Sequence, residues 1–356
     1  MIIIALFVLI LSLLGTLAYK HLKAFNYWKD RGIFNPKPLP FFGNIFDIAT
    51  FTKSGGEVFK DLYDQSDAPY LGIYLLDRPV LLMKDPQIIK RILIKDFRLF
   101  TDRTLAESTH NDIFRNFLLM SRSGRWKLLR NQLTPLFTSG KLKGMTDKIN
   151  DVSNNLMFQI SKSKDPLCVK EIYTNFMTEA IARCFFNIET KCLEDDKSIF
   201  REILRKLFNP SWKTLGVQLL YFVRTSWVNY LGLNFVDTTA IGYLIKVFTE
   251  VIETRKEINV SKPKDIVDLM IVNKNKKDEG FGKTGHFASG VQFLVAGIET
   301  TSTGLSWFMF EMCQRQDIQE KLREEIIRVL RKHNGQITYD AVQEMKYLDL
   351  CYLGIY

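Results

Sequence analysis

The sequence predicts a mainly α-helical protein with a small β-sheet near its start, an α+β class. Two observations lead to this prediction. From residue 85 onward, successive segments place apolar residues three and four positions apart, as one face of a helix requires. Before them, residues 70–85 form an apolar stretch interrupted at Asp77, Arg78 and Pro79, which is typical of two short strands joined by a turn.

The first predicted helix covers residues 85–97. Asp85 suits the N-cap and Pro86 the first helical position, because the N–H that proline lacks would have no partner there. No internal repeat and no second boundary is present, so one domain is expected over residues 44–356. Further helices are predicted from the spacing of apolar residues at 124–137, 175–186, 198–208, 265–272, 290–314 and 317–332.

The composition is that of a folded, basic protein. The 356 residues are 46% hydrophobic and 25% charged, which excludes a mainly disordered chain. The net charge of +10 suits nucleic acid, an anionic membrane surface or an acidic protein partner. The basic residues are spread along the chain without a zinc-finger or RNA-binding motif, so no nucleic-acid partner is expected. The five cysteines form no Cys-x-x-Cys pair, which favours a reducing compartment over a disulfide framework.

Residues 1–19 carry no charged side chain and are long enough to span a bilayer as one helix. Lys20, Lys23, Lys29 and Arg31 follow this segment. Positive charge after a span favours keeping the rest of the chain on the cytoplasmic side. A cleaved signal peptide is the alternative, but the basic region that should precede its apolar part is missing. The sequence therefore predicts a membrane anchor helix over residues 1–19.

A basic and proline-rich hinge is predicted over residues 20–43. Three prolines stand within five residues in the run "NPKPLPFFGN" at 35–44, which makes a stiff, extended segment. Gly43 then permits a turn. This segment can be an ordinary linker, and it can also be a rigid spacer that fixes the orientation of the domain on a membrane. The two interpretations are compatible.

A polar run interrupts the predicted helix 290–314. An isolated buried carboxylate is costly, yet Glu299 is followed by four hydroxyl residues at 300–303. Small residues nearby remove bulk from one helical stripe, so that a flat or large group could approach the backbone. This stripe consists of Gln292, Phe293, Ala296, Gly297 and Thr300.

Thr300 presents a hydroxyl to the same stripe and can bond back to the carbonyl four residues earlier. Glu299 beside it could exchange protons with a water admitted there. The alternative is a tight helix crossing, with hydroxyls bonded to their own backbone. In a second run, Trp126 and Arg130 lie at i, i+4 on one helical face, where an indole and a guanidinium suit a carboxylate or a phosphate.

Together these segments resemble the cytochrome P450 monooxygenases, in particular the microsomal, insect-type branch that metabolises xenobiotics. The resemblance covers nearly the whole chain to Leu350. The matching motifs occur in the order that the family has, after the predicted anchor: "PKPLPFFGN", "FRLFTDR", Trp126-x-x-x-Arg130 with "LTPLFTSGKLK", "DIVDLMI", "FLVAGIETTS", "EKLREEI" and "MKYLDL".

The resemblance implies a cytochrome P450 fold, haem b with its iron, and a site along the helix that carries "FLVAGIETTS". Ala296 and Gly297 match the small pair beside the oxygen-binding pocket, and Glu299 with Thr300 matches the acid and alcohol that relay protons. Trp126 and Arg130 match the residues that hold the haem propionates.

The implied reaction inserts one oxygen atom from O2 into a lipophilic substrate. The implied electrons come from NADPH through a membrane reductase, with cytochrome b5 as a second possible partner. The family location is the cytoplasmic face of the endoplasmic reticulum membrane. Residues 104–119 and 208–248 match the parts of the family that contact substrate and membrane.

The sequence departs from the family in two places. The cysteine loop that supplies the iron ligand is not found, so no metal ligand is assigned, and neither is the Glu-x-x-Arg helix that follows "MKYLDL". Glu320–Arg323 and Glu325–Arg328 have that spacing on an upstream charged helix and are read as surface residues. The expectation is therefore a catalytic domain that is incomplete at its C-terminal side, with a non-catalytic, membrane-anchored fragment as the alternative.

Overall fold

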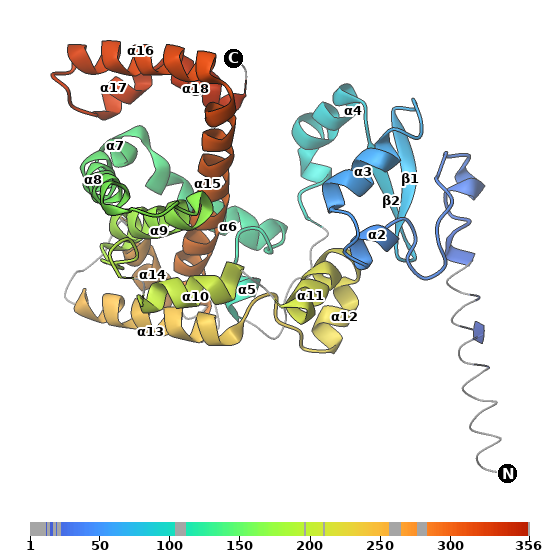
Figure 1. Ribbon diagram of the computed structural model, residues 1–356. Coiled ribbons are helices and arrows are strands. Elements are labelled where there is room, and N and C mark those ends of the chain that lie inside the picture. Colours follow the sequence, from blue (N-terminus) through green and yellow to red (C-terminus); the bar gives the residue numbers. More distant parts are fainter. Residues whose placement is uncertain are drawn as a thin grey trace. The chain divides into compact units, whose positions relative to one another are not determined.

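The computed structural model describes residues 12, 15, 16, 19, 23–103, 112–195, 197–208, 211–255, 265–275 and 283–354 (Figure 1). The predicted anchor therefore lies almost entirely outside the described residues. Within them, no helix combines the length and apolar character that a membrane span needs. The chain divides into two compact units: Met1–Ser108 with Trp212–Phe235, and Thr109–Ser211 with Val236–Tyr356. The boundaries predicted after residues 19 and 43 stay predictions.

The first unit contains the small sheet. β1 (Tyr70–Leu75) and β2 (Arg78–Met83) are antiparallel, in a register that runs from Tyr70 opposite Met83 to Leu75 opposite Arg78. The turn lies one residue earlier than predicted, because Leu76 takes the left-handed conformation at φ +60° and Arg78 already pairs. The predicted class, mainly α with a small sheet, is confirmed.

The segment predicted as a hinge packs on β1. Trp28 is buried and its indole N–H donates to the Ile73 carbonyl at 3.0 Å, while its ring covers Gly72. Farther along, Gly43 bridges to Leu75 at φ +64°, and a Cβ on Gly43 would lie 2.4 Å from the Tyr74 carbonyl oxygen. The end of the proline-rich run is thus fixed to the sheet by backbone contacts.

The helices of the first unit are short. Asp85 caps α4 by accepting from the backbone N–H groups of Gln87 (2.6 Å) and Ile88 (3.0 Å), which confirms its predicted role. The predicted helix then continues as a π-helix, Arg91–Lys95. The helices of this unit are α2 (Phe46–Ala49), α3 (Gly55–Tyr63), α4 (Pro86–Lys90), α11 (Trp212–Val223) and α12 (Thr225–Tyr230).

The second unit is helical and is organised along α15 (Ala288–Gln314). Figure 1 shows α14 near the N-terminal end of this helix and α16 to α18 at its C-terminal end. α9 (Val169–Ile181) packs against its middle. The other helices are α5 (Asp112–Arg115), α6 (Ser123–Leu133), α7 (Ser139–Lys143), α8 (Thr146–Lys162), α10 (Ile199–Phe208), α13 (Thr238–Thr254), α14 (Ile266–Asn275), α16 (Gln316–Lys332), α17 (Tyr339–Glu344) and α18 (Lys346–Leu353).

Three glycines at seven-residue intervals let other elements approach α15 closely. A Cβ on Gly290 would lie 2.9 Å from the Met270 sulfur, and one on Gly304 would lie 3.1 Å from the Tyr352 hydroxyl. Gly297 stands between them. Because seven residues are close to two helical turns, the three glycines share one side of α15. Ala296 and Thr300, which are both exposed, lie beside this side of the helix.

One sequence interpretation is wrong. Glu325 is not a surface residue: it is 7% exposed, and its carboxylate accepts from the backbone N–H groups of Tyr347 and Leu348, both at 2.9 Å. These donors lie in the first turn of α18, where helix N–H groups lack partners within the helix. The charged face of α16 therefore carries one acid that caps its neighbour.

We predict that alanine at two glycines with the same backbone conformation will have different effects. Gly32→Ala, at φ +63° with open space around it, should cost about 1–2 kcal/mol for the left-handed conformation alone. Gly43→Ala should cost about 4 kcal/mol or more, because the added carbon meets a fixed backbone oxygen. Urea unfolding of both variants measures the difference, and equal losses would contradict the packing of Gly43 on β1.

Candidate functional site

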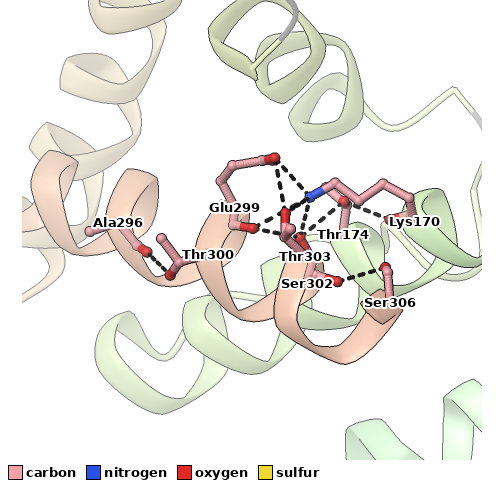
Figure 2. A network of polar contacts seen from close by, with 8 residues as sticks. All are labelled: Lys170, Thr174, Ala296, Glu299, Thr300, Ser302, Thr303 and Ser306. Carbon is pink, nitrogen blue, oxygen red and sulfur yellow. Dashed lines mark hydrogen bonds and ion pairs between the residues drawn. The ribbon is translucent and has the colours of Figure 1, made fainter. Parts of the chain in front are cut away.

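Ala296 and Thr300 form an exposed strip on one side of α15. The Thr300 hydroxyl donates to the Ala296 carbonyl oxygen at 2.6 Å (Figure 2). This is the back-bond that the sequence predicted for a threonine in a helix interior. Since Ala296 offers only a methyl group, a flat molecule could lie against the helix at this strip.

Gly297 lies at a helix crossing. A Cβ on Gly297 would stand 2.6 Å from the Ile181 Cδ1 of α9. The side of α15 that carries Gly297 is therefore filled by α9, as the alternative of a tight crossing requires. The assignment of Gly297 to cofactor binding stays a prediction. Its demonstrated effect is to bring α9 and α15 together.

The Glu299 carboxylate points toward α9, away from the Thr300 hydroxyl (Figure 2). Its Oε1 lies 2.8 Å from the Lys170 ammonium and accepts from the Thr303 hydroxyl at 3.3 Å. The side chains of Glu299 and Lys170 are each 40% exposed. The acid is thus paired and half-exposed, which removes the cost expected for an isolated buried carboxylate. The structure does not bring the functional groups of Glu299 and Thr300 together.

Lys170 is the residue of this site that the sequence did not single out. Besides Glu299, its ammonium donates to the hydroxyls of Ser302 (2.9 Å) and Thr303 (2.6 Å). Helix α9 was predicted to begin at residue 175, but it begins at Val169, so its first turn was missed. An available signal was Pro166 shortly upstream, since proline often precedes a helix start.

Aromatic side chains gather beside the exposed strip. Phe293, one turn before Ala296 and Gly297, stacks on Phe137 with ring centroids 5.2 Å apart and on Phe185 at 5.9 Å. One residue before Phe293, the Gln292 side-chain oxygen accepts from the backbone N–H of Leu118 at 2.7 Å. These contacts fix the chain on both sides of α6 against the N-terminal half of α15.

Trp126 and Arg130 both lie in α6, four residues apart, so the predicted helical face exists. Trp126 is half-buried and Arg130 is exposed. Phe137 stands shortly after this helix, and its stacking on Phe293 places the chain that leaves α6 next to α15. An indole and an exposed guanidinium on one face can bind an anionic group.

Comparison with known proteins identifies the family. The family profile described as cytochrome P450 matches residues 35–352. The chain belongs to the cytochrome P450 family. It is 34% identical to cytochrome P450 6k1 of Blattella germanica over 350 residues, covering 92% of this chain and 66% of that protein. The chain thus spans slightly less than two thirds of that relative.

Two further relatives are also insect proteins. Cytochrome P450 6a2 of Drosophila melanogaster is 31% identical, with 96% of this chain and 71% of that protein covered. Cytochrome P450 6B1 of Papilio polyxenes is 32% identical, with 96% and 70% covered. The predicted family and its insect branch are confirmed.

A cytochrome P450 implies haem, and the exposed strip of α15 fits one face of it. Ala296 leaves room for a flat ring, Thr300 offers a hydroxyl, and Arg130 with Trp126 offers groups that suit propionates. Burial raises the pKa of the Cys184, Cys192 and Cys351 thiols, which does not suit a thiolate ligand. In the part of the chain that the structure describes, no group of three or more His, Cys, Asp or Glu residues could hold a metal ion.

His286, just before α15, predicts a pH dependence of stability. It is 8% exposed, and burial, followed by the positive charge of Lys274, lowers its pKa to about 4 from 6.5. The unfolded chain therefore takes up a proton between these pH values while the folded chain does not. Stability should fall as the pH falls from 6.5 toward 4, by up to about 3 kcal/mol from this residue.

His286→Leu should remove this contribution and flatten the acid side of the stability curve, and Lys274→Gln should reduce it slightly. Urea unfolding at half-unit steps between pH 4.5 and pH 7 measures the slopes. A slope for His286→Leu equal to that of the unchanged protein would refute a buried, neutral histidine.

Proposed function

We propose that this cytochrome P450 chain serves a haem-thiolate monooxygenase that inserts one oxygen atom from O2 into a lipophilic substrate, using electrons from NADPH. The observation that carries the proposal is the exposed strip of α15. There the Thr300 hydroxyl lies beside the small side chain of Ala296 and next to Glu299 in the sequence. Family membership favours this enzyme over the alternative of a non-catalytic membrane-anchored fragment.

Haem supplies the oxygen chemistry when it is bound. The residues of this chain would bind and orient it and would handle protons at its edge. Arg130 and Trp126 would hold the propionates, and the small side chain of Ala296 would let the haem ring lie close to α15. Thr300 would hold a proton at its Oγ1, which in the structure is directed to the Ala296 carbonyl. Glu299 would exchange protons with solvent, because its carboxylate is half-exposed on the other side.

A lipophilic substrate is supported by the aromatic cluster of Phe137, Phe185 and Phe293. The three rings lie next to the exposed strip, and Phe137 is 42% exposed. Apolar ring faces so close to the reacting region would bind an apolar molecule by removing its surface from water. They offer no charged group for a polar one.

An acidic electron donor is supported by charge. The net charge is +10, and α6 exposes Lys127 and Arg130 after Arg122 at its N-cap. Complementary charge speeds the encounter of redox partners more than it tightens their complex. We therefore propose an NADPH-dependent reductase as the partner, with cytochrome b5 as a second donor that can use the same charges.

Attachment to the cytoplasmic face of the endoplasmic reticulum membrane is proposed from the predicted anchor and from the first unit. This unit exposes aromatic side chains at Phe41 (62%), Phe51 (45%), Trp212 (72%) and Tyr230 (89%). Phe51 and Trp212 contact each other with ring centroids 5.1 Å apart. Exposed aromatic residues are typical of a membrane interface.

Replacing the hydroxyl tests the reaction. In the haem-loaded enzyme with its reductase, Thr300→Ala should lower product formed per NADPH about tenfold or more and release hydrogen peroxide instead, because proton delivery fails. Thr300→Ser should retain most of the product. Thr249→Ala is the matched control, since Thr249 makes the same back-bond, to Ile245 at 2.7 Å, on α13. Unchanged coupling in Thr300→Ala would remove Thr300 from the relay.

Fluorescence quenching tests the membrane face. The chain has five tryptophans, of which Trp212, Trp227 and Trp307 are 72%, 50% and 62% exposed. In vesicles that contain brominated lipids, Trp212→Phe should remove a large part of the quenching of the unchanged protein. Trp307→Phe should leave the quenching as it is. Equal quenching with and without Trp212 would contradict the membrane contact proposed for α11.

A further inference from the structure

The ammonium group of Lys170 donates hydrogen bonds to several side chains of α15. Lys170 lies in the first turn of α9, and its Nζ reaches the Glu299 carboxylate at 2.8 Å, Ser302 Oγ at 2.9 Å and Thr303 Oγ1 at 2.6 Å (Figure 2). An ammonium has three donors, and these three short contacts use all of them. The Lys170 side chain is therefore directed toward one turn of α15.

The first turn of α9 is itself held from the other side. Glu171 accepts at a single carboxylate oxygen from Arg201 at 2.6 Å and from Arg205 at 2.8 Å, both on α10. These hydrogen bonds, that of Arg205 first, hold the pKa of Glu171 below its usual range. The residue next to Lys170 is thus a fixed anion, and the backbone from which Lys170 extends is tied to α10.

A cleft of about 220 Å³ opens between α9, α10 and α15. Lys170 and Glu299 line it together with Glu171, Arg201, Arg205 and Phe208, among others. The carboxylate of Glu299 therefore faces a space lined by charged groups, whereas the Thr300 hydroxyl belongs to the exposed strip on another side of α15. Left to itself, a glutamate side chain has rotamers that would reach either side.

We propose that Lys170 is a positioning residue, which holds Glu299 at this cleft and so determines the side from which Glu299 exchanges protons with solvent. The effect on proton exchange rests on the proposed function, whereas the ion pair between Lys170 and Glu299 does not. Stability is not the purpose of the pair, because an ion pair between half-exposed side chains contributes at most about 1 kcal/mol. The lysine can thus be replaced without loss of the fold.

The geometric part is tested by zero-length crosslinking of the unchanged chain. A water-soluble carbodiimide activates the Glu299 carboxylate, and the Lys170 amine then displaces the activating group as a urea, leaving one new amide bond. Peptide mass spectrometry should find residues 170 and 299 joined, and Lys170→Met should abolish this product. The exposed pair Lys206–Glu202, also at 2.8 Å, is the internal standard. Crosslinking of the standard without any joining of residues 170 and 299 overturns the inference.

The functional part is tested in the haem-loaded enzyme with its reductase, by measuring product per NADPH as a function of pH in H2O and D2O. Lys170→Met should lower product per NADPH about fivefold, the rate equivalent of about 1 kcal/mol, and should change the solvent isotope effect. Lys170→Arg keeps the charge and should restore most of the loss. Lys206→Met should behave like the unchanged enzyme.

Glu299→Gln separates the two proposals. If Glu299→Gln uncouples the enzyme but Lys170→Met leaves coupling, pH profile and isotope effect unchanged, Glu299 acts without Lys170 and the inference fails while the proposed function stands. If Glu299→Gln itself changes nothing, the proposed role of Glu299 fails, and the inference about its positioning fails with it. A loss in Lys170→Met that Lys170→Arg restores supports the positioning role.

Discussion

The close approach of α9 to α15 is the constraint on which the site depends. Gly297 has no Cβ, so Ile181 of α9 fills the space 2.6 Å from where that carbon would be. Contact at this point decides what every neighbouring residue of α15 faces, because positions on a helix are fixed relative to one another. With α9 against Gly297, the strip of Ala296 and Thr300 remains exposed, and Glu299 falls within reach of Lys170.

Charge completes the arrangement that packing begins. The side chain of Glu299 is 40% exposed, and the ammonium of Lys170 and the hydroxyl of Thr303 fix the direction of its carboxylate. The same principle recurs at Glu325, where two backbone N–H groups of α18 replace the lysine. In both places the acid joins two helices. Its partner is so distant in the sequence that no local pattern reveals the contact.

The limits of the sequence analysis follow from this distance. Long periodic helices such as α15 and α16 were predicted within two residues, and the cap at Asp85 was predicted from local chemistry alone. The first turn of α9 was missed although Val169, Ile172 and Tyr173 have the i, i+3, i+4 spacing of one helical face, and Lys170 was missed with it. Glu325 was misread, although it stands on the apolar stripe between Leu322 and Val329, which is itself a signal of burial.

The geometry also restricts how Glu299 and Thr300 could work as a pair. A hydroxyl has one proton to donate, and Thr300 gives it to the Ala296 carbonyl, so in this state it can only accept elsewhere. Donating it toward a bound group requires breaking a bond worth about 1 kcal/mol, which thermal motion supplies readily. The carboxylate of Glu299 is directed to the other side of the helix, so a proton passing between the two residues needs a rotation of Glu299 or a mobile carrier. The residue that holds the Glu299 carboxylate therefore controls this proton transfer, and in this chain that residue is Lys170.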